Sequence, residues 1–296
     1  MDPFRVADGV FGIDFELFDE QVCAAYLIDD EEPALIDAGS AVGADRLLAG
    51  ISNCGVDPAS LEHIVCSHIH VDHTGAVAEL VARSGATVYI HESTAAHLID
   101  PEGLIRSSER AMGANFERVG APPPVPAAHV VEVREERRTI ETGRYQLDLR
   151  HHPGHSPDHF AVWLPVQSLL FAGECVAMHL PKADCWLPPA TLPQFDVGLV
   201  HDAIDALRTL PAETVVFPHF GVPPLSGEAL FDHADALLDR FDEEVRRLYD
   251  AEPSLEATRA AVGAELIDCS PPYDPAVQSF YAKLVTEGFL TYHGRL

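Results

Sequence analysis

The chain of 296 residues carries 47 acidic and 19 basic side chains, which gives a formal charge of −28 at pH 7. Hydrophobic residues make up 47% of it, enough to form a buried core, and this excludes disorder of the chain as a whole. The acidity argues against a nucleic-acid partner, because a phosphate backbone requires a basic surface. No apolar run reaches the ~20 residues of a membrane helix, and the N-terminus does not resemble a signal peptide. We therefore expect a cytoplasmic protein without nucleic-acid or membrane partners; whether it forms a homodimer is left open.

The basic residues are unusual in kind, since only two of the 19, Lys182 and Lys283, are lysines. The acidic residues are spread along the whole chain and are not gathered in a tail. A net charge this far from zero destabilises the compact state by self-repulsion unless salt screens it. The composition therefore predicts a protein of a high-salt cytoplasm, the alternative being an ordinary acidic protein.

The cysteines do not form a Cys-x-x-Cys pair, and in a chain of this length their scatter does not indicate a disulfide framework. Most of them lie in apolar stretches and are predicted to be small core residues. The six are Cys23, Cys54, Cys66, Cys175, Cys185 and Cys269.

The first part of the chain alternates between strand and helix patterns. Residues 9–17 and 22–29 predict paired strands, and residues 33–37 predict a short strand that ends in a turn. The patterns that follow are a helix over 42–53, a buried strand over 63–66, a helix over 75–84 and a strand over 86–90. This alternation indicates an α/β layer.

The second part begins with mostly helical residues over 92–118 and a stiff, proline-rich linker over 121–128. The linker leads into a second β-rich run, with strands near 129–133, 137–141, 145–151, 160–164 and 168–172, then a helix over 195–209 and a strand over 214–217. Helical patterns over 227–250, 254–262 and 274–288 complete the chain. We therefore expect an α/β domain over residues 1–224 and a helical C-terminal extension over residues 225–296.

The strongest chemical signal is the segment Ser67-His68-Ile69-His70-Val71-Asp72-His73-Thr74-Gly75, which follows an apolar strand and precedes a helix. It offers three imidazoles and one carboxylate on what we expect to be an exposed turn. Such ligands suit Zn²⁺, Fe²⁺ or Mn²⁺. His68 and His70 share a face of an extended backbone. Asp72 and His73 lie past the strand end, where they could face a second ion.

The pattern His-x-His-x-Asp-His after a strand resembles the hallmark of the metallo-β-lactamase superfamily. Four further matches follow that family's pattern: Asp37-Ala38-Gly39, His152-Pro153-Gly154-His155, Glu174 after a strand, and His219 after a late strand. The resemblance covers residues 35–221. It implies an α/β fold, the four-layer αβ/βα metallo-β-lactamase sandwich, here with a C-terminal helical extension.

The resemblance also implies two adjacent metal positions. His68, His70 and His155 would bind the first ion, and Asp72, His73 and His219 would bind the second. Asp37 would orient the ligands from behind, the usual task of a carboxylate beside a metal-bound imidazole, with a turn-forming aspartate as the alternative. We expect two divalent ions, with zinc preferred and iron or manganese as alternatives.

Glu174 departs from the family pattern, which usually has an aspartate here that bridges both ions. Because glutamate is one methylene longer, three outcomes are open: it bridges, it binds one ion, or it lies outside the ligand set. We expect it to bind at least one ion, since a buried unpaired carboxylate is costly. His179 and Trp186 lie on what we predict to be a loop after Glu174, and we consider them as substrate contacts.

The resemblance is strongest to the glyoxalase II-like metallohydrolases. It implies a hydrolase that uses a metal-bound hydroxide on a small ester-like substrate, a thioester or a lactone. Asp72 would be its catalytic residue, as an ion ligand and an acceptor for the water. A mononuclear Fe(II) persulfide dioxygenase-like enzyme and a non-catalytic metal-binding protein are the alternatives.

The net charge predicts that the thermal stability of the protein depends on the salt concentration. We expect the thermal unfolding midpoint to be higher in molar KCl than in low-salt buffer, because screening removes the repulsion among the acidic side chains. Melting curves followed by circular dichroism measure this, and a midpoint that does not rise would contradict salt adaptation.

Overall fold

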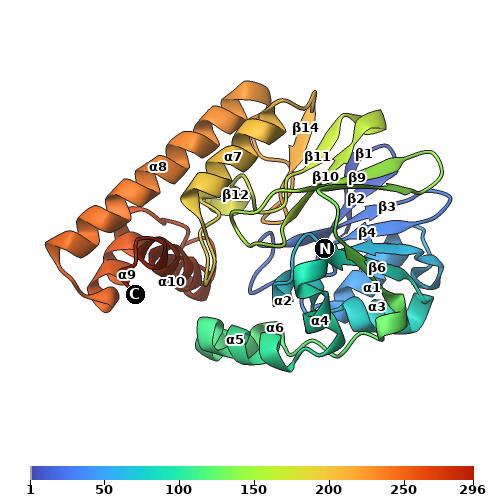
Figure 1. Ribbon diagram of the computed structural model, residues 1–296, viewed down its shortest axis with the longest axis horizontal. Helices are drawn as coiled ribbons and strands as arrows, with labels where there is room; N and C mark the ends of the chain where they lie inside the picture. The colour runs from blue at the N-terminus through green and yellow to red at the C-terminus, as the bar shows by residue number, and fades with distance from the viewer. Residues whose placement is uncertain (1) are drawn as a thin grey trace.

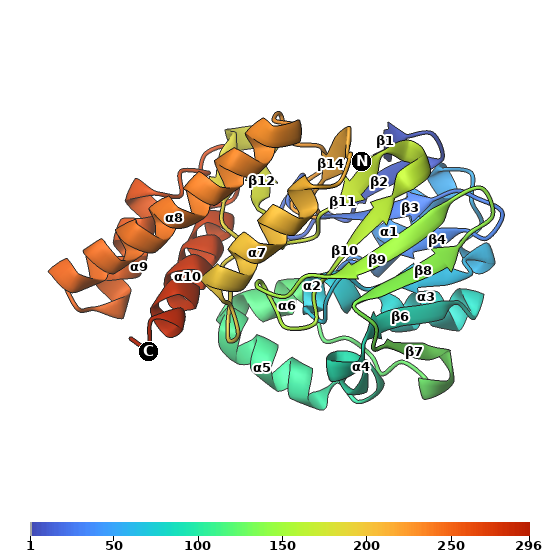
Figure 2. The ribbon, with the colours of Figure 1, turned by 45° about the horizontal axis from the view of Figure 1, so that its top comes forward.

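Two β-sheets packed face to face, with helices outside them, form the body of the molecule (Figure 1, Figure 2). The computed structural model describes residues 2–296. Within these residues the first sheet has the order β1-β2-β3-β4-β5-β6-β7. Its strands are β1 (Phe4–Ala7), β2 (Val10–Asp14), β3 (Ala24–Ile28), β4 (Ala34–Ile36), β5 (His63–Val65), β6 (Thr87–His91) and β7 (Val130–Val133). The pairs from β1 to β4 are antiparallel and those from β4 to β7 are parallel.

The second sheet has the order β14-β11-β10-β9-β8 in the described chain. Its strands are β8 (Arg137–Glu141), β9 (Gln146–His151), β10 (Phe160–Leu164), β11 (Leu169–Phe171) and β14 (Thr214–Val216). A separate hairpin consists of β12 (Met178–Leu180) and β13 (Cys185–Leu187). Because β11 and β14 are parallel neighbours, the segments that follow them leave the sheet side by side.

Helices connect these strands and follow them. In chain order they are α1 (Ala44–Asn53), α2 (Val71–Thr74), α3 (Val77–Ser84), α4 (Glu92–Ile99), α5 (Glu102–Met112), α6 (Phe116–Val119), α7 (Val197–Arg208), α8 (Gly227–Ala251), α9 (Leu255–Glu265) and α10 (Pro275–Tyr292). None of the helices within residues 2–296 is long and apolar enough to cross a bilayer.

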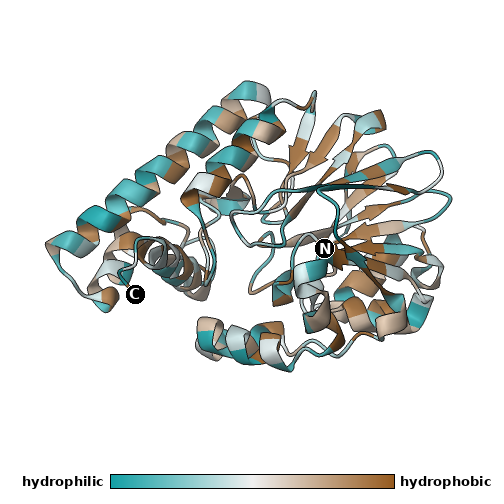
Figure 3. Cartoon of the chain, in the orientation of Figure 1, coloured by the Kyte–Doolittle hydropathy of each residue, from teal (hydrophilic) through white to brown (hydrophobic). Residues whose placement is uncertain are grey.

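The alternation of side chains along the strands produces the layers. Tyr26 of β3 and Val162 of β10 belong to the apolar cluster between the two sheets. Their neighbours Leu27 and Trp163 belong to the cluster formed with the helices on the outer faces. Strands in the middle of the sheets, such as β3 and β10, are accordingly buried along their whole length and mostly apolar (Figure 3). The result is the four-layer αβ/βα sandwich that the resemblance implies.

The C-terminal helices extend one side of the sandwich. Helix α8 contacts α7 and α10, and α10 contacts α9 (Figure 1, Figure 2). Buried side chains of α8 and α10, among them Phe231, Phe241 and Phe289, belong to the same apolar cluster as the outer faces of the sheets. The helical character predicted for residues 225–296 is confirmed, while the division into two domains at residue 224 stays a prediction.

Some predictions of local structure are wrong. The strand near 129–133 was assigned to the second β-rich run, but β7 pairs with β6 in the first sheet. The stretch after Glu174, expected to be a loop, forms the hairpin β12-β13, and β1 was not predicted. Sheet membership depends on pairing between distant segments, and the local pattern of a short strand does not encode it.

Gly288 provides a test of how α10 packs. A Cβ at this position would lie 2.7 Å from the backbone oxygen and 2.8 Å from the backbone nitrogen of Thr191. Alanine favours a helix over glycine by up to ~1 kcal/mol, but overpacking typically costs about 1–3 kcal/mol. We therefore expect Gly288→Ala to lower the free energy of unfolding by about 1 kcal/mol in denaturant titrations.

The control is Gly103→Ala in α5, where the nearest atoms of the His97 ring lie at 3.7 Å. This substitution should leave stability unchanged or raise it slightly. Equal stabilities for the two variants would contradict the close approach of α10 to Thr191.

Candidate metal centre

The histidine-rich segment lies where β5 ends and α2 begins. Strands β4 and β5 are parallel, so their carboxyl ends are adjacent and Asp37, which follows β4, lies beside residues 67–73. The predicted exposed turn is wrong for most of the segment, because His68 and His73 are fully buried. The segments that carry His155, Glu174 and His219 come from the second sheet and lie against this histidine-rich segment. His70 and Asp72 alone among these ligand candidates are partly exposed.

Three imidazole nitrogens converge in a first cluster. Nε2 of His68 lies 2.8 Å and Nε2 of His155 lies 3.1 Å from Nδ1 of His70. Burial and the neighbouring imidazoles lower the pKa of His68 well below its usual value, and burial with His155 lowers the pKa of His70 to about 4. These two rings are therefore neutral at pH 7, with lone pairs available for a cation.

A second cluster lies beside the first and contains Asp72, His73, Glu174 and His219. Nε2 of His73 lies 2.8 Å and Nε2 of His219 lies 3.0 Å from Oε1 of Glu174. Oδ2 of Asp72 lies 3.6 Å from each of these nitrogens. Mixed imidazole and carboxylate ligands are typical of zinc, iron and manganese sites.

Glu174 contacts both clusters. While its Oε1 faces His73 and His219, its Oε2 lies 3.2 Å from Nε2 of His155 in the first cluster. Burial raises the pKa of this carboxyl, but the charges of His155 and His219 outweigh burial and hold the pKa well below its usual value. The backbone N–H of Glu174 donates to Nε2 of His159, at 2.9 Å. The longer side chain therefore lies between the clusters, as a bridging carboxylate would.

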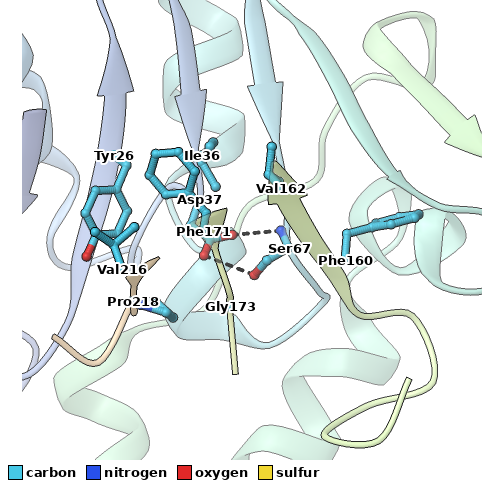
Figure 4. Close-up of a pocket in the computed structure, with 10 residues that line it drawn as sticks. All are labelled: Tyr26, Ile36, Asp37, Ser67, Phe160, Val162, Phe171, Gly173, Val216 and Pro218. Atoms are coloured by element: carbon cyan, nitrogen blue, oxygen red, sulfur yellow. Dashed lines mark hydrogen bonds between the residues drawn. The ribbon is translucent and has the colours of Figure 1, made fainter. Parts of the chain in front are cut away.

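Asp37 lies behind His73. Its carboxylate accepts hydrogen bonds from the backbone N–H and the hydroxyl of Ser67, at the edge of an apolar pocket between the sheets (Figure 4). It also lies 2.9 Å from Nδ1 of His73. Burial lowers the pKa of His73, but the nearby Asp72 and Asp37 outweigh it and raise the pKa well above its usual value. Asp37 thus orients His73 so that Nε2 of this ring faces the second cluster. Asp37 therefore lies where the resemblance implies a carboxylate that supports a ligand.

Backbone carbonyls orient two further imidazoles. Nδ1 of His155 lies 2.8 Å from the oxygen of Pro189, and Nδ1 of His219 lies 2.8 Å from the oxygen of Val22. Each contact assigns the proton to Nδ1 and leaves Nε2 directed into the centre. The imidazoles are therefore held in the tautomers that a cation requires.

Two side chains at the centre were not singled out from the sequence. Sγ of Cys23 lies 4.0 Å from Nε2 of His219. The hydroxyl oxygen of Tyr281, on α10, lies 3.1 Å from Nδ1 of the same ring. Both residues are buried. Neither residue belongs to one of the motifs, so the spacing within the motifs does not indicate them.

His179 and Trp186, considered above as substrate contacts, pair across the hairpin β12-β13. The His179 ring packs on Trp186 at a centroid distance of 4.6 Å and approaches Asp184. The backbone of His179 bonds to both His219 and Phe220. His179 thus supports the segment that carries His219, and a substrate contact by either residue stays a prediction.

The model of the metallo-β-lactamase superfamily matches residues 19–219. This chain belongs to the metallo-β-lactamase superfamily. A relative within it, the metallo-beta-lactamase fold-containing protein ST1585 of Sulfurisphaera tokodaii, is 26% identical over 205 residues, or 67% of this chain and 75% of that protein. The hydroxyacylglutathione hydrolase of Rhodospirillum rubrum is 28% identical over 175 residues, or 59% of this chain and 52% of that protein.

A solved structure of the superfamily extends the similarity to the C-terminal helices. The metallo-beta-lactamase family protein TTHA1429 of Thermus thermophilus superposes with a TM-score of 0.70 at 18% identity. The alignment covers 97% of this chain and 94% of that one. The fold of this chain, including its C-terminal extension, is therefore shared within the superfamily.

The position of Glu174 leads to a prediction about metal content. Glu174→Ala should lower the amount of metal that copurifies with protein never exposed to a chelator, because both clusters lose a carboxylate oxygen. Elemental analysis measures the ratio of metal to protein. Glu174→Asp, which introduces the family's usual residue, is the matched control and should retain metal. An unchanged metal content in Glu174→Ala would remove Glu174 from the ligand set.

Proposed function

We propose that this chain is a metal-dependent hydrolase that activates water with two divalent ions, zinc preferred, and cleaves a small thioester or lactone. The observation that carries the proposal is the carboxylate of Glu174, which directs one oxygen to each cluster. This arrangement favours two ions over one. The similarity to a protein named as a hydrolase supports the class of reaction.

The residues present fit such a pair of ions. Neutral imidazoles of His68 and His70, with His155, would hold the first, and His73, His219, Asp72 and Glu174 would hold the second. When bound, divalent ions lower the pKa of water from 15.7 to about 7 and polarise a carbonyl oxygen. No serine or cysteine nucleophile is then required.

Asp72 has the position expected of a group that handles the proton of the attacking water. It lies in the first turn of α2 and is partly exposed, while its Oδ2 lies 3.6 Å from the inner nitrogens of His73 and His219. A carboxylate there can accept a hydrogen bond from water at the centre and orient it toward a substrate. Since His70 is the other partly exposed ligand candidate, we expect substrate to approach along this side.

The surrounding contacts fix the orientation of the imidazole rings before any substrate binds. Asp37, the Pro189 carbonyl and the Val22 carbonyl fix His73, His155 and His219 from behind. A centre that is already organised needs little reorganisation energy during the reaction. We further propose that the enzyme works in a high-salt cytoplasm, as its charge of −28 suggests.

The test of this function is metal analysis combined with a panel of thioesters, lactones and phosphodiesters assayed in high salt. We expect near two ions per chain and turnover of a thioester or a lactone. Bound iron with oxygen consumption in the presence of a persulfide would instead indicate the dioxygenase. Metal without turnover of any of these substrates would favour the non-catalytic alternative.

Asp72→Ala should abolish turnover, with kcat reduced at least about 100-fold, because the variant loses the carboxylate that orients water. Steady-state kinetics on the substrate identified by the panel measure this. The matched control is Glu79→Ala, which removes an exposed carboxylate from the following helix α3 and should leave kcat unchanged. Retained activity in Asp72→Ala would refute the proposed mechanism.

A further inference from the structure

Cys23 approaches the second cluster from an element that carries none of the predicted ligands. It lies immediately before β3 and is 1% exposed. Its Sγ lies 4.0 Å from Nε2 of His219, the nitrogen that faces Glu174. The ligand atoms of Cys23, His73 and His219 all lie within 4.8 Å of one another.

The distances suit coordination of one cation. Zinc binds sulfur at about 2.3 Å and imidazole nitrogen at about 2.0–2.1 Å, so in a tetrahedral site the two atoms lie roughly 3.5 Å apart. The observed separation of 4.0 Å between Sγ and Nε2 is about half an ångström longer. A small rotation of the cysteine side chain closes this difference.

Backbone hydrogen bonds hold the segment that contains Cys23 beside the segment that contains His219. On one side the carbonyl of Val22 accepts from Nδ1 of His219, at 2.8 Å. On the other side the N–H of Ala24 donates to the carbonyl of Pro218, at 2.8 Å. Because hydrogen bonds flank Cys23 on both sides, its backbone is held beside the segment that carries His219, and only rotation about the Cα–Cβ bond moves the sulfur.

The alternative is that Cys23 merely fills the core, as buried cysteines often do. Cys175 illustrates that role, since its sulfur donates to the Ala172 carbonyl at 2.9 Å. The contact recorded for the Cys23 sulfur is instead with a ring nitrogen that points into the centre. Among the described residues, Cys23 is also the one cysteine that belongs to a group able to hold a metal ion.

We propose that Cys23 is a thiolate ligand of the ion in the second position, together with His73 and His219 and next to the carboxylates of Asp72 and Glu174. On binding, the S–H bond breaks, the electron pair on sulfur forms the bond to the metal, and the proton leaves to solvent. No oxidation or reduction occurs. This inference rests on the metal-binding part of the proposed function.

The two metal positions then differ in the types of ligand atom that they offer. The first offers three imidazoles and one oxygen of Glu174, whereas the second adds a soft sulfur ligand to imidazole and carboxylate. Thiolate selects zinc, iron or cobalt over manganese and magnesium. The second position should therefore discriminate among metals more strongly than the first.

The experiment uses the full chain, stripped of metal and reloaded with Cd²⁺ or Co²⁺. Wild-type protein should develop the ultraviolet thiolate-to-metal charge-transfer band with an amplitude of one thiolate per chain. Cys23→Ser should lose the band. Cys269→Ser, which changes a buried cysteine outside the ligand groups, is the matched control and should keep it.

A second measurement is competition between Zn²⁺ and Mn²⁺. Cys23→Ser should weaken the preference for zinc in the second position at least about tenfold, since even residues behind the ligands typically change metal affinity about 10–100-fold. A wild-type protein that binds two Cd²⁺ ions without a thiolate band would overturn the inference whether or not the variant folds.

These outcomes separate the inference from the proposed function. Turnover of a thioester or lactone without a thiolate band leaves the hydrolase standing and removes Cys23 from the ligand set. The opposite outcome is a thiolate band that Cys23→Ser abolishes, in a protein that hydrolyses no substrate of the panel. This result supports Cys23 as a metal ligand and counts against the hydrolase function.

Discussion

The carboxylate of Glu174, buried between imidazoles on both sides, is the interaction on which the rest of the centre depends. A buried charge is costly unless it is paired, and here His73, His155 and His219 supply the pairing. The side chain follows β11, the parallel neighbour of the strand that precedes His219. The adjacent ends of β11 and β14 thus place Glu174 and His219 together, while the first sheet supplies His73.

A second set of contacts lies outside the ligand candidates and fixes their orientation. These contacts come from many parts of the chain: Asp37 after β4, the Val22 carbonyl before β3, the Pro189 carbonyl after β13, and Tyr281 on the last long helix. His159 supports the backbone of Glu174 in the same way. Because an imidazole binds a cation only in the correct tautomer, these outer contacts determine which nitrogen of each ring faces the centre.

The local patterns predict most of the strands and helices, whereas the four-layer sandwich and the membership of both clusters follow from the resemblance of the motifs to those of the superfamily. The sequence does not predict the burial of His68 and His73, which results from the second sheet closing over the first. Nor does it indicate Cys23 or Tyr281, which reach His219 from positions 196 and 62 residues away along the chain. The pairing of β7 with the first sheet and the hairpin β12-β13 depend on packing that local patterns do not encode.

The scattered origin of the centre has a consequence for folding. Side chains and carbonyls from residue 22 to residue 281, drawn from both sheets and from α10, meet at one place. The local segment His68–His73 alone offers three imidazoles and Asp72, and it lacks Glu174, His155 and His219. A cation held by these clusters would therefore bind the assembled chain better than an incomplete form of it. The binding free energy of such a cation would then add to the stability of the whole fold, because its ligands come from both sheets.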